Sequence, residues 1–296
     1  MRCRTADRPT LRGGTSPVVR PVDIGDDFGV TALDRNIREY YERGQETDRL
    51  AGKFPSGPLE LARTQELILR HLPPGPLEIL DVGGGPGVYA EWLANAGHQI
   101  RLVDPIGLHV EQALARHADV IAVQGDARNL DEHDGSFDVV LLLGPLYHLT
   151  EKNDRLQALR EAHRVLRTGG LLFGAGISRY AAMLDLLIRL DRLHEPDLVE
   201  RVKEAVASGT FDGHASGLFT TAYFHLPDEL IGEVSRAGFE DAKVFNIEGP
   251  GFLVGDFAER WSDPARRDAM LSLARLVESE PALMGASSHL LVVART

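Results

Sequence analysis

Short apolar runs alternate with amphipathic stretches between residues 77 and 177, and this alternation constrains the fold more than any other feature of the chain. The runs have the length of single strands and read LEILDV (77–82), QIRLVD (99–104), VIAVQGD (120–126), FDVVLLLG (137–144) and LLFGAGI (171–177). The fourth run is almost continuously apolar, as expected of a parallel strand covered on both faces. Strands that alternate with helices predict a doubly wound, Rossmann-like α/β sheet, which binds ligands at the carboxyl ends of its strands.

The regions on either side of this alternation predict a single domain preceded by a leader. Residues 1–25 are rich in Arg, Pro, Gly and Thr and lack an amphipathic face, so a disordered leader is favoured over an organellar transit peptide. The stretch at 178–226 is longer than a regular crossover needs, which predicts an insertion over the ligand edge of the sheet. The expected parts of the domain are N-terminal cap helices (26–75), a ligand-binding core (76–177), a helical insertion after the fifth strand (178–226) and the C-terminal part of the sheet (227–296).

The composition excludes several classes of protein. The 32 Lys and Arg residues against 44 Asp and Glu give a net charge of −12, which argues against nucleic acid as a partner. The single cysteine, Cys3, permits neither an internal disulfide nor a cysteine-based metal site, and the histidines lack metal-ligand spacing, so no metal is expected. No apolar run is long enough to span a bilayer, and no secretory signal is recognisable. We therefore expect a soluble, cytoplasmic protein without a membrane partner.

The turn DVGGGPG (81–87) indicates the kind of ligand. It departs from the dinucleotide pattern G-x-G-x-x-G, because Gly83 and Gly85 fit but the third glycine, Gly87, comes one residue early. Pro86 lacks the N–H that an approaching phosphate would use. Asp81 would repel a pyrophosphate but suits an ammonium group. S-adenosylmethionine carries an ammonium and a sulfonium and has no phosphate, so the turn favours it over a nicotinamide or flavin dinucleotide.

Acidic residues follow at the ends of the next two strands. Asp104 ends the second strand, where a carboxylate can accept hydrogen bonds from ribose hydroxyls. Asp126 ends the third strand, where its side chain and the next backbone N–H can meet an adenine edge. With these elements in order, residues 77–176 resemble the class I S-adenosylmethionine-dependent methyltransferases, and most of all their small-molecule and secondary-metabolite branch.

This resemblance implies a mostly parallel, seven-stranded sheet with a reversed final hairpin, and S-adenosyl-L-methionine as the methyl donor, released as S-adenosyl-L-homocysteine. It places the methionine part of the donor on the glycine turn, the ribose at Asp104 and the adenine at Asp126. A helix before the sheet often folds over the donor in this family. The donor-binding residues expected on these grounds are Tyr41, Arg63, Asp81, Gly83, Gly85, Gly87, Asp104, Pro105, Asp126, Ala127, Leu143 and Gly144. For Arg63, a surface ion pair with Glu60 or Glu66 is the alternative.

Methyl transfer from a sulfonium is an in-line displacement, so a general base is needed only if the acceptor loses a proton. His148, just beyond the fourth strand, is the candidate base, and the alternative is that it orients the loop or contacts the donor. The candidates for an acceptor pocket, each with simple packing as the alternative, are Tyr40, Tyr147, Arg179, Tyr223 and His225.

These observations predict an enzyme that methylates a small molecule at an oxygen, nitrogen or carbon atom, as a monomer or homodimer. A peptide acceptor remains open. The alternatives are a protein that binds S-adenosylmethionine for a regulatory purpose or for another reaction, and a dinucleotide-dependent oxidoreductase.

Overall fold

The structure is a computed structural model that describes residues 35–42, 44, 50, 55–213 and 219–296. The predicted leader at 1–25 lies outside the described residues. The described residues belong to one compact unit. Its helices are α1 (Arg35–Tyr41), α2 (Gly57–His71), α3 (Val88–Asn95), α4 (Gly107–Arg116), α5 (Pro145–His148), α6 (Lys152–Val165), α7 (Ala181–Ile188), α8 (Pro196–Ser208), α9 (Pro227–Arg236), η4 (Gly249–Leu253), α10 (Phe257–Ser262), α11 (Pro264–Val277) and η5 (Pro281–Ala286).

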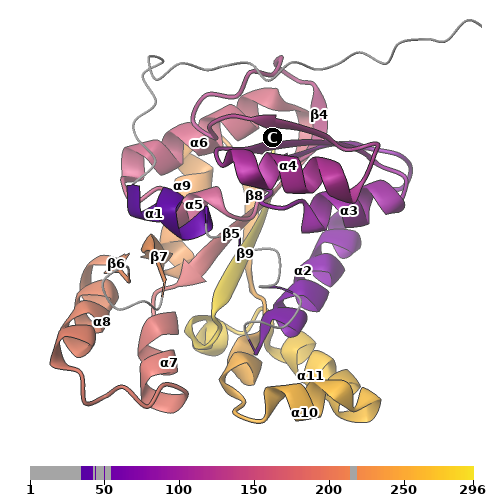
Figure 1. Cartoon of the computed structure of the whole chain (residues 1–296). Helices are drawn as coiled ribbons and strands as arrows, with labels where there is room; N and C mark the ends of the chain where they lie inside the picture. The colour runs from indigo at the N-terminus through magenta and orange to yellow at the C-terminus, as the bar shows by residue number, and fades with distance from the viewer. Residues whose placement is uncertain (1–34, 43, 45–49, 51–54, 214–218) are drawn as a thin grey trace, which may run out of the picture. The chain divides into compact units, whose positions relative to one another are not determined.

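The strands form one sheet in the order β3-β2-β1-β4-β5-β7-β6, and β9 pairs with both β5 and β8 (Figure 1). Neighbours among β1 to β5 run parallel, whereas β8 and β9 form the reversed hairpin at the end of the chain. The strands are β1 (Glu78–Val82), β2 (Gln99–Asp104), β3 (Ile121–Gln124), β4 (Phe137–Leu142), β5 (Leu166–Ser178), β6 (Thr210–Asp212), β7 (Thr221–His225), β8 (Glu240–Asn246) and β9 (His289–Arg295). The predicted mostly parallel α/β fold is confirmed, and the described residues form two strands more than the seven expected.

Helices cover both faces of the sheet, and alternation along the strands explains why. Successive strand residues point to opposite faces, so Ile79 of β1 packs toward α2, α3 and α4, whereas Leu80 packs toward α6 and α9 (Figure 1). Val139 and Val140 of β4 divide in the same way. Both faces are therefore apolar, and the polar strand ends are left to build a site.

The two additional strands come from the insertion after β5. The first part of β5 pairs with β4, but Ile177 and Ser178 extend past the end of β4 and pair with Phe224 and His225 of β7. The short strand β6 then pairs antiparallel with β7. The insertion is thus not purely helical, since a hairpin attaches it to the carboxyl edge of the sheet.

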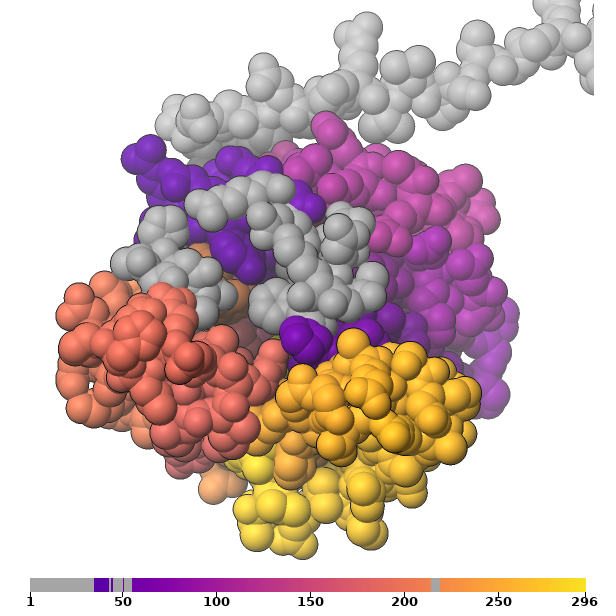
Figure 2. Space-filling model, turned by 60° about the horizontal axis from the view of Figure 1, so that its bottom comes forward, coloured from indigo at the N-terminus to yellow at the C-terminus, as the bar shows by residue number. Residues whose placement is uncertain are grey.

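The helices of the insertion lie beside the C-terminal segment. Figure 2 shows the segment with α7 and α8 next to the one with α10 and α11 on this face. Arg189 of α7 donates a hydrogen bond of 3.3 Å to the carbonyl of Phe252 in η4. None of the helices in the described part of the chain is long and apolar enough to cross a membrane.

Candidate functional site

The glycine turn after β1 is shaped by positive backbone angles. Gly83 and Gly85 have φ of +68° and +56°, a region that residues with a Cβ rarely adopt. A Cβ at Gly83 would lie 2.6 Å from Cδ of Pro145, and one at Gly84 would lie 2.5 Å from Oδ2 of Asp81. The turn therefore needs glycine at these positions, and it leaves room for a ligand to lie against the backbone.

A cleft opens beside this turn, at the carboxyl ends of β1 to β4. It encloses about 1040 Å³ of empty space, including the space at its open mouth. The residues predicted from the sequence that line it are Tyr41, Asp81, Gly83, Gly85, Asp104, Pro105, Asp126, Ala127, Leu143, Gly144, Tyr147 and His148.

Asp81 is the most unusual group in the cleft. It is fully buried, and neither carboxylate oxygen has a hydrogen-bond partner among the residues that the structure describes. Burial, together with the negative charge of Asp104, raises the pKa of Asp81 to about 7. A buried carboxylate without partners fits a ligand that brings hydrogen-bond donors and a positive charge, as an ammonium group does.

Asp104 is held by the protein itself. Its Oδ2 accepts from the N–H of Gly85 at 2.9 Å, and its Oδ1 accepts from the N–H of Ile106 at 2.9 Å and from Nδ1 of His109 at 3.0 Å. Each carboxylate oxygen has two lone pairs, so one lone pair on Oδ2 remains for a ligand. The Asp104 carboxylate therefore has room to accept a hydrogen bond from one ribose hydroxyl and not from both.

His109 was missed by the sequence interpretation. It lies in the first turn of α4, lines the cleft and is 3 % exposed. A carboxylate only accepts hydrogen bonds, so Nδ1 of His109 donates to Asp104. Nε2 is buried with no partner in the described part of the chain, which makes it a candidate contact for a polar group of the ligand. Its place five residues after Asp104, at the start of the next helix, was the available signal.

Asp126 is already engaged at the third strand end. Arg128 donates to it from its backbone N–H at 2.8 Å and pairs with its carboxylate through Nη2 at 2.5 Å. Arg128 also bonds Asp154 at 2.8 Å. This fixes the Asp126 carboxylate beside Ala127, and a contact of Asp126 with adenine stays a prediction.

His148 and Tyr41 meet across the mouth of the cleft. Nε2 of His148 lies 2.6 Å from the hydroxyl of Tyr41, which joins α5 to α1. The Tyr41 ring also packs edge-on against His109, and Tyr147 packs against His148. The aromatic side chains of Tyr41, Tyr147 and His148 thus line one side of the cleft, together with the Tyr41 hydroxyl and Nε2 of His148.

Two residues predicted to bind the donor, Gly87 and Arg63, do not line the cleft. A Cβ at Gly87 would lie 2.9 Å from Cβ of Ala113, so this glycine serves the contact between α3 and α4 and does not line the cleft. Arg63 is fully buried away from the cleft, where it donates to Glu66 at 2.7 Å and to Glu278 at 2.5 Å. Its guanidinium is used to join α2 to the end of α11, and not by a ligand carboxylate.

Three of the predicted acceptor residues belong to a buried polar cluster that does not line the cleft. Arg179 donates to the carbonyl of Phe224 and to Glu229, and His225 is fully buried. The guanidinium of Arg155 lies 3.7 Å from the centre of the Tyr223 ring. We call this cluster the β7 network; its members are Arg155, Arg179, Tyr223, His225, Glu229 and Glu233.

Arg179, Tyr223 and His225 do not line the cleft, and their roles in an acceptor pocket stay predictions. Tyr40 also does not line the cleft, since its ring packs against Tyr41 and Phe219. Of the predicted acceptor residues, Tyr147 alone lines it.

The doubly wound sheet and the cleft at its carboxyl edge are typical of an α/β enzyme that binds a nucleoside. The buried Asp81 favours a ligand with a positively charged group over one with a pyrophosphate. The orphaned Asp81 and the glycine turn fit S-adenosylmethionine. Comparison with known proteins agrees, since residues 80–174 match a family model described as a methyltransferase domain.

Two curated relatives extend this match. The chain is 30 % identical over 177 residues to the ubiquinone/menaquinone biosynthesis C-methyltransferase of Ruegeria sp. (strain TM1040), covering 57 % of this chain and 68 % of that protein. It is 34 % identical over 148 residues to the ubiquinone biosynthesis O-methyltransferase of Methylocella silvestris, covering 44 % of this chain and 56 % of that protein.

Among solved structures, phosphoethanolamine N-methyltransferase 2 of Haemonchus contortus in complex with S-adenosyl-L-methionine has a TM-score of 0.55. It is 20 % identical, and the match covers 90 % of this chain and 60 % of that chain, so it shows a shared fold. The chain belongs to the class I S-adenosylmethionine-dependent methyltransferases.

Proposed function

We propose that this methyltransferase acts on a small-molecule acceptor that loses a proton from the attacked oxygen or carbon atom. S-adenosylmethionine, when bound, supplies a methyl group on a sulfonium that is already reactive. The tasks left to the protein are to orient the acceptor, to exclude water and to take up the proton.

The observation that carries this proposal is the pair of His148 and Tyr41. His148 ends α5 and lines the cleft. Its Nε2 lies 2.6 Å from the Tyr41 hydroxyl. Histidine accepts protons near neutral pH. An acceptor hydroxyl that takes the place of the Tyr41 hydroxyl would present its proton to Nε2, so His148 is the proposed general base.

Three features support a small acceptor. The packed aromatic side chains of Tyr41, Tyr147 and His148 narrow one side of the cleft. The net charge of −12 is unfavourable for nucleic acid. The two curated relatives are named for C- and O-methylation in quinone biosynthesis, which are reactions at carbon and oxygen.

The test is transfer of a labelled methyl group from S-adenosylmethionine to a panel of phenols, quinols and amines. We expect label on phenols or quinols, and His148→Ala should lower kcat by about 10²- to 10⁴-fold, the usual contribution of a general base. Affinity for S-adenosylhomocysteine should stay within a few-fold of the parent. His163→Ala is the matched control, because His163 lies on α6 and packs against Phe239. An unchanged kcat in His148→Ala, or label on amines alone, would contradict the proposal.

A further inference from the structure

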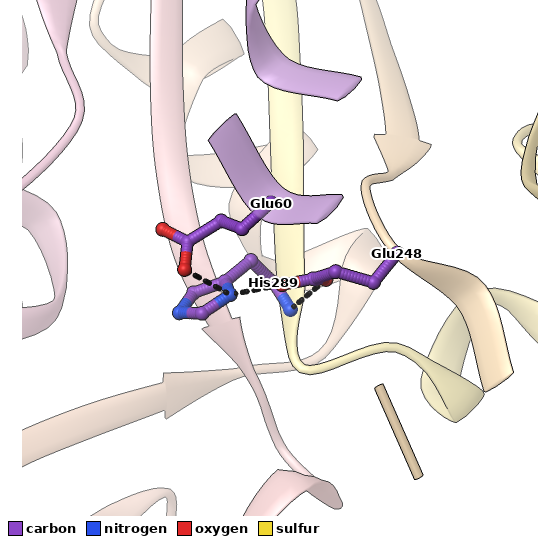
Figure 3. A group of neighbouring side chains, drawn as sticks. All are labelled: Glu60, Glu248 and His289. Atoms are coloured by element: carbon purple, nitrogen blue, oxygen red, sulfur yellow. Dashed lines mark hydrogen bonds and ion pairs between the residues drawn. The ribbon is translucent and has the colours of Figure 1, made fainter. Parts of the chain in front are cut away.

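Three metal-binding side chains converge outside the donor cleft. Glu60 lies in the first turn of α2, Glu248 follows β8, and His289 begins β9, where it pairs with Ile177 at the carboxyl end of β5. One ligand atom from each of the three lies within 4.8 Å of the other two. Figure 3 shows the His289 ring between the two carboxylates, which reach it from different elements.

The geometry of this cluster is set by hydrogen bonds to Glu248. Its Oε1 lies 2.6 Å from Nδ1 of His289, and its Oε2 accepts from the hydroxyl of Ser287 at 2.8 Å and from the N–H of His289 at 3.0 Å. The hydroxyl of Ser287 in turn accepts from the backbone N–H of Glu248. Glu248 is therefore fixed by its surroundings, as metal-binding carboxylates are in proteins.

The charges of the cluster favour a cation. Glu60 and Glu248 are 8 % and 1 % exposed, and both face the same imidazole nitrogen. Nδ1 carries at most one proton, which lies toward Glu248 at 2.6 Å, while Oε2 of Glu60 is 3.7 Å away and beyond hydrogen-bond length. A cation bound between two buried carboxylates would offset part of the cost of removing them from water.

We propose that Glu60, Glu248 and His289 bind a divalent transition-metal ion such as Mn²⁺, Co²⁺ or Zn²⁺. Nδ1 of His289 lies 2.6 Å from Oε1 of Glu248 and 3.7 Å from Oε2 of Glu60, whereas ligand atoms about 2.0 to 2.2 Å from one ion lie at most about 4.4 Å apart. An ion bound by Nδ1 and the two carboxylates therefore replaces the proton between Nδ1 and Glu248, which is released to solvent. An imidazole nitrogen with two carboxylates suits these ions better than Mg²⁺ or Ca²⁺, which prefer oxygen ligands alone. Three protein ligands leave at least one coordination position for water or for a ligand of the ion.

The test is metal binding by the full chain, stripped with a chelator and free of any affinity tag. Titration with Co²⁺, followed by its visible absorption, and with Mn²⁺, followed by electron paramagnetic resonance, should each show one bound equivalent. His289→Gln and Glu60→Gln should each weaken binding at least about 10-fold, as loss of a ligand does. Glu66→Gln is the control, because Glu66 lies on the same helix but pairs with Arg63 and Arg275; its affinity should equal that of the parent.

A second measurement separates loss of the site from loss of the fold. Glu60→Gln leaves the hydrogen bond between Glu248 and His289 in place, and each variant should bind S-adenosylhomocysteine with unchanged affinity. Absence of stoichiometric binding by the parent chain, or equal affinity in all variants, would overturn the proposal. Metal binding is measured without a methyl acceptor, so its outcome is independent of the proposed function. The proposed function is tested separately by methyl transfer.

Discussion

Asp81 and Glu233 are both buried carboxylates, but their surroundings shift their pKa values in opposite directions. Asp81, in the donor cleft, has no hydrogen-bond partner among the described residues, and burial raises its pKa to about 7. Glu233, in the β7 network, accepts from Nε and Nη2 of Arg155 at 2.9 and 2.8 Å. Burial opposes ionisation of Glu233, but His225 and Arg155 lower the pKa of its carboxyl to about 2.

The difference separates a group kept for a ligand from groups that hold the fold. Arg155 is the stronger partner of Glu233, because His225 Nε2 lies 3.5 Å away, and Arg155 also donates to the carbonyls of Leu149 and Thr150. Glu233 thus has hydrogen-bond partners within the protein, whereas Asp81 has none among the described residues. His225 differs from Glu233, because both of its buried ring nitrogens lack a hydrogen-bond partner in the described part of the chain.

The largest expected effect is on stability, from Arg155→Met. It leaves the Glu233 carboxylate buried without its bidentate partner, and removing one member of a buried ion pair costs about 3–5 kcal/mol. The free energy of unfolding in urea should fall by this amount. The double variant Arg155→Met/Glu233→Leu should recover part of the loss. A fall of less than about 1 kcal/mol would mean that the network contributes little.

The second prediction uses the opposite pKa shifts of the two carboxylates. Because the folded-state pKa of Asp81 is raised from 3.8 to about 7, the ligand-free protein should lose stability as the pH rises through this range, by at most about 4 kcal/mol at 1.36 kcal/mol per unit. Glu233 acts in the other direction, and its contribution is lost as the pH falls from 4.5 toward 2. Urea unfolding of Asp81→Asn should lack the fall in stability that the parent protein shows between about pH 4 and pH 7. The same fall in both proteins would contradict the raised pKa of Asp81.

The third prediction concerns the donor. Asp81→Asn should weaken S-adenosylhomocysteine binding roughly 10- to 100-fold at a pH above 7, because a hydrogen bond to a charged group contributes about 1.5–3 kcal/mol. In the parent chain the affinity should fall as the pH drops below about 7, where Asp81 becomes protonated. Calorimetry measures both. Asp138→Asn is the control, since Asp138 pairs with Arg167 at the opposite end of β4, and equal losses in the two variants would remove Asp81 from the donor site.

The smallest effect is expected from His109→Asn, whose side-chain amide keeps a donor near the position of Nδ1 for Asp104 but removes Nε2. Loss of one neutral hydrogen bond costs about 1 kcal/mol, so S-adenosylhomocysteine affinity should fall roughly 5-fold. His98→Met, at a site far from the cleft before β2, should leave the affinity unchanged. Affinity equal to that of the parent would show that His109 serves Asp104 alone.

The strands and the glycine turn could be predicted because their signals are local. The run at 99–104 coincides with β2, and Asp81, Asp104 and Asp126 were found from their positions at strand ends. The roles of Arg63 and Arg179 could not be predicted, because their partners are distant in the sequence: Glu278 lies 215 positions from Arg63 and Glu229 lies 50 from Arg179. A buried arginine and a ligand-binding arginine look the same until the partners are known.

The hairpin β6–β7 escaped prediction for a different reason. Its first strand, Thr210–Asp212, is too short for a periodic pattern, and it forms because the extended β5 offers an edge to β7. Tertiary pairing, and not local propensity, therefore decides this part of the fold.

The length of β5 has a consequence for which side of the molecule can move. Strand pairing at Ile177 and Ser178 ties the hairpin to the sheet, so this wall of the molecule moves only if sheet hydrogen bonds break. Helix α1 has seven residues and meets the cleft through Tyr41. On the side of α1, by contrast, the contact with the cleft is a side-chain contact between Tyr41 and His148, so this side can adjust without breaking the sheet.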